Sequence, residues 1–355
     1  MIKNKTLLVM AGGTGGHVFP GLAVADNLKG KGWQVSWLGT ADRIEAQLVP
    51  EHGYEIDFID IAGVRGNGIK RLLMAPLRVI KSILQARVVL KKRKVDLVLG
   101  MGGFASGPGG IAAWTLGIPV VLHEQNATAG LTNRILYYFS KKVLMGFSGA
   151  FPSAKAILVG NPVREQLISL PAKKISLQNS ALKVLIVGGS LGAKVLNELL
   201  PKVLSHFDKS QIKLLHQSGK GHYQYLQNAY QQRGIEVDVQ EFITDMGAAY
   251  QWADLVICRA GALTVAEIAV VGLPAIFVPL PHATDDHQTK NAGQLVEIKA
   301  AVLIPQNELN EQKLSDYLHR FSQNRTLLEE MSKNSRKIAI IDATERVAAI
   351  CNELI

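Results

Sequence analysis

Short apolar runs alternate with helix-like patterns along the whole chain. In the first half these runs span 6–11, 33–38, 56–61, 95–100, 119–122, 142–145 and 156–159, and in the second half 182–187, 211–216, 236–241, 254–258, 275–278 and 301–304. They are rich in Val, Ile and Leu rather than alternating with polar residues, which is typical of strands that are covered on both faces. Strands that alternate with helices indicate parallel sheets. We therefore predict an α/β fold of doubly wound parallel sheets.

The two halves of the chain begin alike. Residues 7–16 read LLVMAGGTGG and residues 184–193 read VLIVGGSLGA, each a strand followed by a Gly-rich turn and an amphipathic helix. At roughly 100–200 residues per domain, the 355 residues fit two domains of one plan. A proline disfavours helix at the residue before it, so Asn161-Pro162 suits a boundary. We predict domains at 1–162 and 163–341, with a last helix at 342–355 that returns to the first domain.

Composition narrows the class of protein. Hydrophobic residues make up 48% of the chain and charged residues 19%, which suits packed cores rather than disorder. Two cysteines, Cys258 and Cys351, are too few for a disulfide framework. A membrane-spanning helix would need about 18 or more consecutive apolar residues, and the sequence contains no such run. We expect neither a disulfide-stapled nor a membrane-spanning protein.

The net charge of +10 is concentrated in one segment, residues 65–94, which hold ten Lys or Arg and no Asp or Glu. On a helix starting at Pro76, the apolar residues cover an arc of roughly 200°, wider than the ~100° that burial on one core needs. This pattern has two interpretations: a buried helix with a solvated basic rim, or a contact with an anionic membrane surface. The segment lacks the interleaved aromatics that favour nucleic acid. The candidate membrane contacts are Leu77, Arg78, Ile80, Lys81, Leu84, Lys91 and Lys92.

Three Gly-rich or polar loops follow strands in the first half: Gly12–His17, Gly102–Gly110 and His123–Asn126. Glycines at a helix start let backbone N–H groups approach an anion closely. Val18 stands where the dinucleotide fingerprint needs its third glycine, so that fingerprint is absent. Ligands of open α/β sheets bind at the carboxyl ends of strands, so the three loops predict one cleft.

The second half repeats this anion-binding pattern at Gly188–Ala193 and again at Arg259–Glu267. A Glu near a helix start, such as Glu267, is either a partner of the helix dipole or a carboxylate that binds a ribose diol. The loop 279–291 contains His282, Asp285, Asp286 and His287. We prefer sugar binding to metal binding there. The absence of an Asp-x-Asp motif argues against a metal that bridges a nucleotide diphosphate, and we expect no metal and no cofactor.

Seven motifs in order resemble the bacterial MurG family, the N-acetylglucosaminyltransferases of peptidoglycan synthesis: GGTGGHVFPGLAVA, RGNGIK, LGMGGFASGPGG, HEQNATAGLTNR, VGNPVR, VGGSLGA and CRAGALTVAEIAVVGLPAIFVP. The resemblance implies the GT-B fold, with two Rossmann-like domains and an interdomain cleft. It also implies an inverting transfer of GlcNAc from UDP-GlcNAc to the C4 hydroxyl of MurNAc in lipid I, a polyprenyl-diphosphate-linked MurNAc-pentapeptide, which gives lipid II. The implied location is peripheral, on the cytoplasmic face of the inner membrane, with no nucleic-acid partner.

The resemblance also implies roles for individual residues. His17 would be the candidate general base, with His123 and Glu124 nearby. The implied substrate-binding residues are Thr14, Gly15, Gly16, Asn126, Arg164, Ser190, Ile243, Ala262, Leu263, Thr264, Val265, Ala266, Glu267 and Gln288. The chain departs from the family pattern at Phe104, where a Tyr is usual, and at His287 before Gln288.

Other GT-B enzymes such as UDP-GlcNAc 2-epimerases are the nearest rivals to this interpretation. An epimerase needs no lipid-facing patch, so the basic, apolar segment disfavours it. A nucleic-acid-binding protein that uses the basic segment is a rival of a different class.

Overall fold

The computed structural model describes residues 5–61, 68–152, 155–176, 180–281 and 283–355. The side chains of residues 68–75 and 284 fall outside this description, as do Arg65 and His282 entirely. Internal contacts divide the chain into unit 1, Met1–Arg164 with Ile340–Ile355, and unit 2, Glu165–Ala339. The sequence placed these divisions after Pro162 and Ile341.

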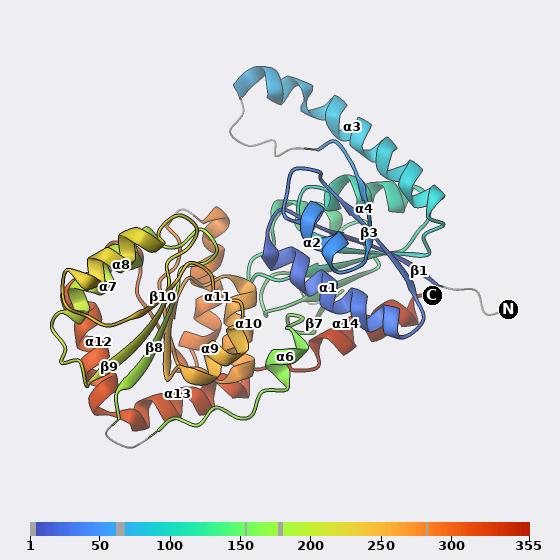
Figure 1. The fold of residues 1–355 in the computed structure, drawn as a ribbon. Helices are drawn as coiled ribbons and strands as arrows, with labels where there is room; N and C mark the ends of the chain where they lie inside the picture. The colour runs from blue at the N-terminus through green and yellow to red at the C-terminus, as the bar shows by residue number, and fades with distance from the viewer. Residues whose placement is uncertain (1–4, 62–67, 153–154, 177–179, 282) are drawn as a thin grey trace. The chain divides into compact units, whose positions relative to one another are not determined.

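Unit 1 is built on a parallel sheet of seven strands in the order β3-β2-β1-β4-β5-β6-β7. Figure 1 shows this unit as a ribbon. Its strands are β1 (Thr6–Ala11), β2 (Gln34–Gly39), β3 (Glu55–Phe58), β4 (Leu97–Gly102), β5 (Val120–Glu124), β6 (Lys142–Met145) and β7 (Ala156–Leu158). Its helices are α1 (Gly15–Gly30), α2 (Glu45–Glu51), α3 (Gly68–Lys92), α4 (Ser106–Thr115), α5 (Leu131–Leu136) and α14 (Ala343–Glu353).

Both faces of this sheet are covered, as the Val/Ile/Leu-rich strands predict. Along β1, Leu7 and Val9 point into a core with α1 and α14, and Leu8 and Met10 point into a second core with α3 and α4. The C-terminal helix α14 contributes Val347, Ala348 and Cys351 to the first core.

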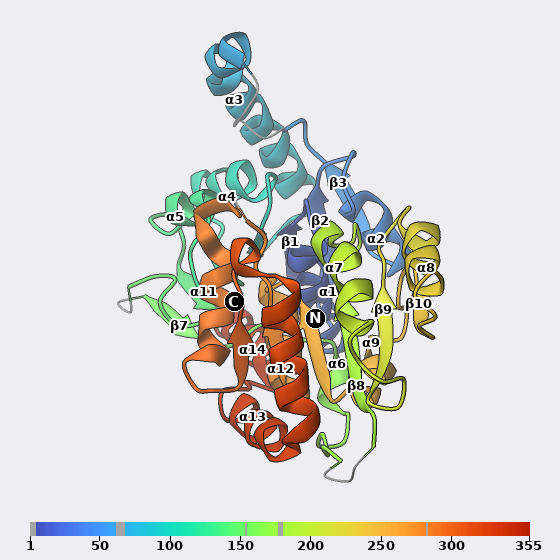
Figure 2. The same cartoon turned by 90° about the vertical axis from the view of Figure 1, so that its left-hand side faces the viewer.

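Unit 2 repeats the plan with six parallel strands in the order β10-β9-β8-β11-β12-β13 (Figure 2). Its strands are β8 (Leu182–Val187), β9 (Ile212–Gln217), β10 (Asp238–Gln240), β11 (Leu255–Cys258), β12 (Ala275–Phe277) and β13 (Ala301–Leu303). Its helices are α6 (Glu165–Ile168), α7 (Lys194–Leu204), α8 (Tyr223–Gln231), α9 (Met246–Trp252), α10 (Ala262–Val271), α11 (His287–Val296), α12 (Glu311–Gln323) and α13 (Arg325–Lys337), with 3-10 turns η1 (Thr284–Asp286) and η2 (Gln306–Glu308).

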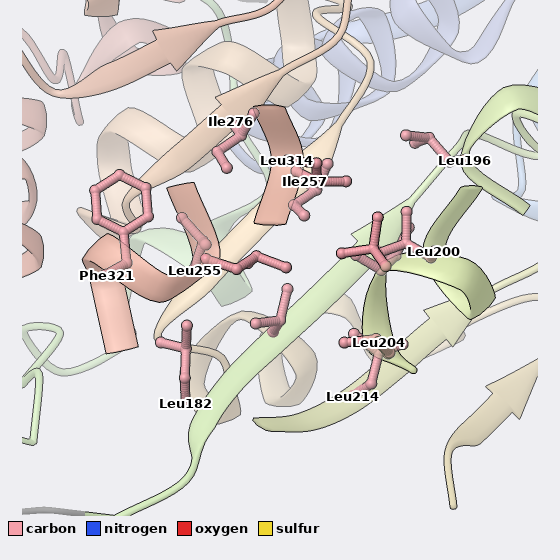
Figure 3. Close-up of a cluster of buried hydrophobic side chains, with 14 of the residues drawn as sticks. Leu182, Leu196, Leu200, Leu204, Leu214, Leu255, Ile257, Ile276, Leu314 and Phe321 are labelled. Atoms are coloured by element: carbon pink, nitrogen blue, oxygen red, sulfur yellow. The ribbon is translucent and has the colours of Figure 1, made fainter. Parts of the chain in front are cut away.

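A buried cluster joins the unit 2 sheet to its helices. Figure 3 shows Leu182, Leu255 and Ile257 from central strands beside Leu200 of α7 and Phe321 of α12. This core supports the strands whose carboxyl ends lead into the candidate site of unit 2, which is described below. All thirteen predicted strands are confirmed, with ends shifted by no more than two or three residues, and so is the doubly wound fold.

Helix α3 differs from the prediction at its start, since it begins at Gly68 and contains Pro76 rather than starting there. From Pro76 onward it has two apolar faces. Ala86, Val89 and Leu90 are buried in the unit 1 core, and α3 packs on α4, as both views show (Figures 1 and 2). The opposite face exposes four apolar side chains, Leu77, Ile80, Leu84 and Val88, at fractions of 52–66%.

The wide apolar arc of α3 is thus the sum of a buried and an exposed stripe. Among the described residues, no helix combines the length and the apolarity needed to cross a bilayer.

Candidate functional site

The candidate site in unit 1 lies where the strand order reverses, between β1 and β4. In a doubly wound sheet this switch point opens a crevice at the carboxyl ends of the strands. The two loops there touch: a Cβ on Gly103 would lie 2.5 Å from the Gly12 carbonyl oxygen, and one on Gly102 would lie 2.8 Å from His17 Nδ1. Both glycines have positive φ, 105° at Gly102 and 92° at Gly103, so side chains there would be strained as well as crowded. Only glycine lets these loops approach so closely.

Helix α1 starts in this crevice with its N-terminus open to a ligand. Thr14 is its N-cap, is exposed, and makes no side-chain capping bond in the described chain, and the first turn holds no acidic residue. Within the same residues, no protein acceptor pairs with the N–H groups of Gly15 and Gly16. An anion at this point would meet donors and the positive end of the helix dipole.

A buried carboxylate shapes the same loop. Glu45, 1% exposed, accepts bonds from Gly13 N at 2.8 Å and from Thr40 N and Oγ1 at 3.1 and 2.7 Å. The Gly13 N–H is therefore already hydrogen-bonded within the protein. The predicted anion-binding loop is reduced to the residues that follow Gly13. Nothing in the local sequence pattern links residue 45 to residue 13, so the role of Glu45 is visible only in the fold.

A chain of hydrogen bonds links the two candidate histidines. His17, half-buried, contacts Gln125 Oε1 through Nδ1 at 3.0 Å, and Gln125 Nε2 contacts His123 Nδ1 at 3.2 Å. His123 Nε2 contacts the Gly160 carbonyl at 2.9 Å. His123 is fully buried, and burial lowers its pKa to about 4, so it is neutral near pH 7. With both ring nitrogens engaged by the protein, His123 is poorly placed to take a substrate proton.

Glu124 is the anchor of the loop that follows β5. Its Oε1 accepts from Asn126 N and Nδ2 at 3.0 and 3.1 Å, and its Oε2 accepts from Gly130 N and Asn133 Nδ2 at 3.1 and 2.9 Å. The side chain is only 2% exposed. Four donors saturate both oxygens, so this geometry favours a structural role for Glu124 over a role as base. Asn126 likewise uses one amide N–H to hold the loop.

Unit 2 has its own switch point, between β8 and β11. The loop after β8 packs on the loop after β9, because a Cβ on Gly192 would lie 2.2 Å from the Ser218 carbonyl oxygen. Ser190 is exposed in this loop, and its carbonyl accepts from Lys220 N at 3.0 Å. After β11, Gly261 caps α10 through its backbone alone, with no acidic residue in the first turn. Both loops are thus suited to bind phosphate groups.

Glu267 lies in α10 and is 5% exposed. The Tyr250 hydroxyl, from α9, donates to its Oε2 at 3.1 Å and orients the carboxylate. Residues 262–266 form the start of the same helix, where Leu263 and Thr264 are half-buried and their neighbours are buried. Tyr250 is a further site residue that the sequence did not indicate.

Two more predicted residues have partners that restrict what they can bind. Gln288 Oε1 accepts from Ala260 N and Leu280 N at 3.2 and 2.9 Å, so only its amide N–H groups remain to donate to a ligand. Ile243 N donates to Gln217 Oε1 at 3.0 Å. The Ile243 carbonyl is therefore the backbone group of this residue that remains to bind a nucleotide base. Arg164, half-buried, is the last residue of the first segment of unit 1, Met1–Arg164.

Comparison with known proteins first defines the class. Residues 7–145 match the glycosyltransferase family 28 N-terminal domain, and residues 183–349 match the C-terminal domain of that family. Two doubly wound sheets with anion-binding helix starts fit this class, and the chain is a family 28 glycosyltransferase of the GT-B fold.

The family can be stated more narrowly. The chain is 76% identical, over the full length of both proteins, to the UDP-N-acetylglucosamine–N-acetylmuramyl-(pentapeptide) pyrophosphoryl-undecaprenol N-acetylglucosamine transferase of Psychromonas ingrahamii. The protein of the same description from Aeromonas hydrophila is 59% identical, over 99% of this chain and 97% of the relative. The chain belongs to this transferase family, as the seven motifs predicted.

Solved structures agree with this assignment. MurG of Acinetobacter baumannii has a TM-score of 0.85 at 41% identity, covering 98% of this chain and 99% of that one. A UDP-GlcNAc 2-epimerase of Neisseria meningitidis, bound to UDP-GlcNAc, has a TM-score of 0.69 at 15% identity, covering 98% and 100%. The second likeness is one of fold alone.

Proposed function

We propose that this protein transfers GlcNAc from UDP-GlcNAc to the C4 hydroxyl of MurNAc in lipid I, which gives lipid II for peptidoglycan synthesis. The observation that carries the proposal is the full-length 76% identity to a transferase named for these substrates. The two switch-point sites, one in each unit, are consistent with two substrates that both carry a diphosphate.

The donor binds to unit 2. The N–H groups at the start of α10, from Ala262 to Thr264, and the Ser190 loop stabilise the negative charge that develops on UDP as it leaves. Glu267, oriented by Tyr250, accepts from the ribose hydroxyls. The Ile243 carbonyl accepts from the uracil N–H, and the amide N–H groups of Gln288 donate to GlcNAc hydroxyls.

The acceptor binds to unit 1. Its diphosphate lies against Thr14, Gly15 and Gly16 at the start of α1. The MurNAc O4 attacks the GlcNAc anomeric carbon, the bond from that carbon to the UDP oxygen breaks, and His17 Nε2 takes the O4 proton. This single displacement inverts the anomeric centre. General-base assistance of this kind contributes about 10²–10⁴-fold to the rate.

The exposed face of α3 binds the cytoplasmic surface of the inner membrane, where the acceptor's polyprenyl chain resides. Leu77, Ile80, Leu84 and Val88 would enter the interfacial region, and flanking Arg and Lys would meet anionic headgroups. Further exposed apolar side chains lie on or next to the neighbouring helices α4 and α5: Trp114, Leu131, Ile135 and Tyr138. The contact is peripheral.

The structure changes how much each basic residue within 65–94 is expected to contribute to membrane binding. Lys81 pairs with Asp60 at 2.8 Å, Lys92 lies 3.8 Å from Asp57, and Arg93 pairs with Asp57 and Glu55. The count over residues 65–94 missed these carboxylates because they precede the segment in sequence. Among the candidate contacts, Arg78 and Lys91 have no carboxylate partner within the described chain, so they should contribute more than Lys81 and Lys92 to binding an anionic surface.

Incubation with labelled UDP-GlcNAc and a soluble short-chain lipid I analogue tests the proposal. Label should pass to the analogue, and omission of the analogue should leave UDP-GlcNAc intact. Conversion of the sugar nucleotide without an acceptor would indicate an epimerase and contradict the proposal.

A further inference from the structure

Gln125 is the only residue that links His17 to His123 by hydrogen bonds among the described residues, and nothing in the proposed chemistry uses it. It is 1% exposed and follows directly on β5. Its backbone carbonyl accepts from Asn161 Nδ2 at 3.0 Å, which fixes the residue from the opposite side. A buried amide that bridges two imidazoles has a defined donor and acceptor direction, and that direction decides which nitrogen of each ring carries the proton.

The donor and acceptor direction of the Gln125 amide follows from the Gly160 end of this chain of hydrogen bonds. The Gly160 carbonyl can only accept, so His123 Nε2 must carry the proton in the 2.9 Å contact. Burial keeps His123 neutral, so its Nδ1 is then a bare acceptor. The group 3.2 Å from that nitrogen must donate, which makes it the Gln125 NH2. The Gln125 carbonyl oxygen therefore faces His17, 3.0 Å from Nδ1.

An amide oxygen facing His17 Nδ1 requires a proton on that nitrogen. In the neutral ring the lone pair then lies on Nε2, which has no protein partner among the described residues. A flipped amide would instead place its oxygen against the bare Nδ1 of His123, and two acceptors would face each other in a buried site. The cost of an unpaired buried polar group, about 1–3 kcal/mol, disfavours the flip.

We propose that Gln125 is a positioning residue that holds His17 in the Nδ1–H tautomer, with Nε2 directed at the acceptor hydroxyl as the proton-accepting atom. The inference rests on the proposed function, because it assigns His17 as the base. In this arrangement the neutral amide performs the orienting task that a carboxylate performs in a catalytic triad.

Two substitutions separate positioning from simple structural support. Gln125→Leu keeps the approximate size and removes the acceptor, so kcat should fall about 10- to 100-fold, as for other lost orienting partners. KM for UDP-GlcNAc should stay within about twofold, because the donor residues belong to unit 2. Gln125→Glu restores an acceptor for the His17 Nδ1–H but places its second oxygen against the bare Nδ1 of His123, so it should recover only part of the lost kcat.

The carboxylate of Gln125→Glu would also stabilise a positive charge on the neighbouring imidazole ring, because opposite charges attract. A base works only when neutral, so the acidic limb of kcat/KM should move to higher pH in this variant and not in Gln125→Leu. The other titratable groups near this loop include the buried His123, Glu124 and Glu45, which both variants retain. Tyr54→Phe, which removes a hydroxyl bond to Asp26 at the opposite end of the unit 1 sheet, is the matched control and should leave kcat unchanged.

Nitrogen NMR of histidine-labelled protein reads the tautomers without any assay of activity. Wild type should show His17 as Nδ1–H and His123 as Nε2–H, and Gln125→Leu should lose the His17 preference. The inference is overturned if wild-type His17 is the Nε2–H tautomer. It is also overturned if Gln125→Leu keeps kcat within about threefold while His17→Ala is strongly impaired. If His17→Ala itself keeps full turnover, the base assignment fails instead, and the NMR result still decides the tautomer.

Discussion

The exposed apolar stripe of α3 makes a measurable prediction about membrane binding. We consider the double variant Leu84→Gln/Val88→Gln, since these side chains are 58% and 66% exposed and their loss leaves the buried stripe untouched. Full burial of such a side chain is worth about 1.5–3 kcal/mol, and roughly 60% of that remains available here. The pair should therefore contribute about 2–4 kcal/mol, which lowers vesicle affinity roughly 30- to 1,000-fold at 1.4 kcal/mol per tenfold.

Flotation with vesicles that contain about 30% anionic lipid measures this affinity, titrated over lipid concentration. Tyr225→Gln/Ile341→Gln is the matched control, because both side chains are similarly exposed, at 54% and 56%, and lie outside α3. Surface changes of this kind alter stability by no more than about 0.5 kcal/mol, so all variants should fold. If the α3 variant binds vesicles as tightly as the control, α3 is an ordinary solvated helix and the membrane contact lies elsewhere.

Three further predictions concern single residues. Glu267→Ala should weaken UDP binding by about 1–3 kcal/mol, the value of charge-assisted hydrogen bonds; unchanged affinity in titration calorimetry would remove Glu267 from the ribose site. His17→Ala should lower kcat by more than about tenfold, with UDP affinity within twofold of wild type; a smaller loss of turnover would show that another group is the base. Burial lowers the pKa of His216 to about 3 from an ordinary 6.5. Between these two pH values His216 is therefore protonated in the unfolded chain and neutral in the folded one. Stability should fall as pH falls below about 6.5, by on the order of 2 kcal/mol at pH 5. Urea unfolding of wild type and His216→Gln at pH 7 and pH 5 should show a smaller pH-dependent loss in the variant, in which the buried His123 still contributes a loss of its own, and an equal loss in both would contradict the assignment to His216.

The sequence predicted the fold well because the signals for it are local. Each buried parallel strand is a short Val/Ile/Leu run, and the turns after β1 and β8 are Gly-rich because loops from neighbouring strands approach within contact distance there. The position of a helix start after such a turn could also be read directly. These features suffice to place both switch points.

The residues that hold the candidate site residues in place could not be predicted in the same way, because each of them contacts a site residue that is distant in sequence. Glu45 holds Gly13 across 32 residues, and Gln125 holds His17 across 108. Tyr250 reaches Glu267 from another helix. No periodicity or spacing encodes such pairs, whose geometry arises only when the sheet brings the loops together. For the same reason, the resemblance placed Glu124 near the candidate base, but only the fold shows the four donors that surround its carboxylate.

The most direct test of the proposed reaction is the structure of its product. Wild-type protein, UDP-GlcNAc and a soluble lipid I analogue should yield a disaccharide, and proton NMR of that product should show a β-linked GlcNAc on the C4 oxygen of MurNAc. The α configuration of the donor would then have been inverted in one displacement. A product with an α linkage would contradict the single displacement, and the absence of any disaccharide would contradict the proposed transfer itself.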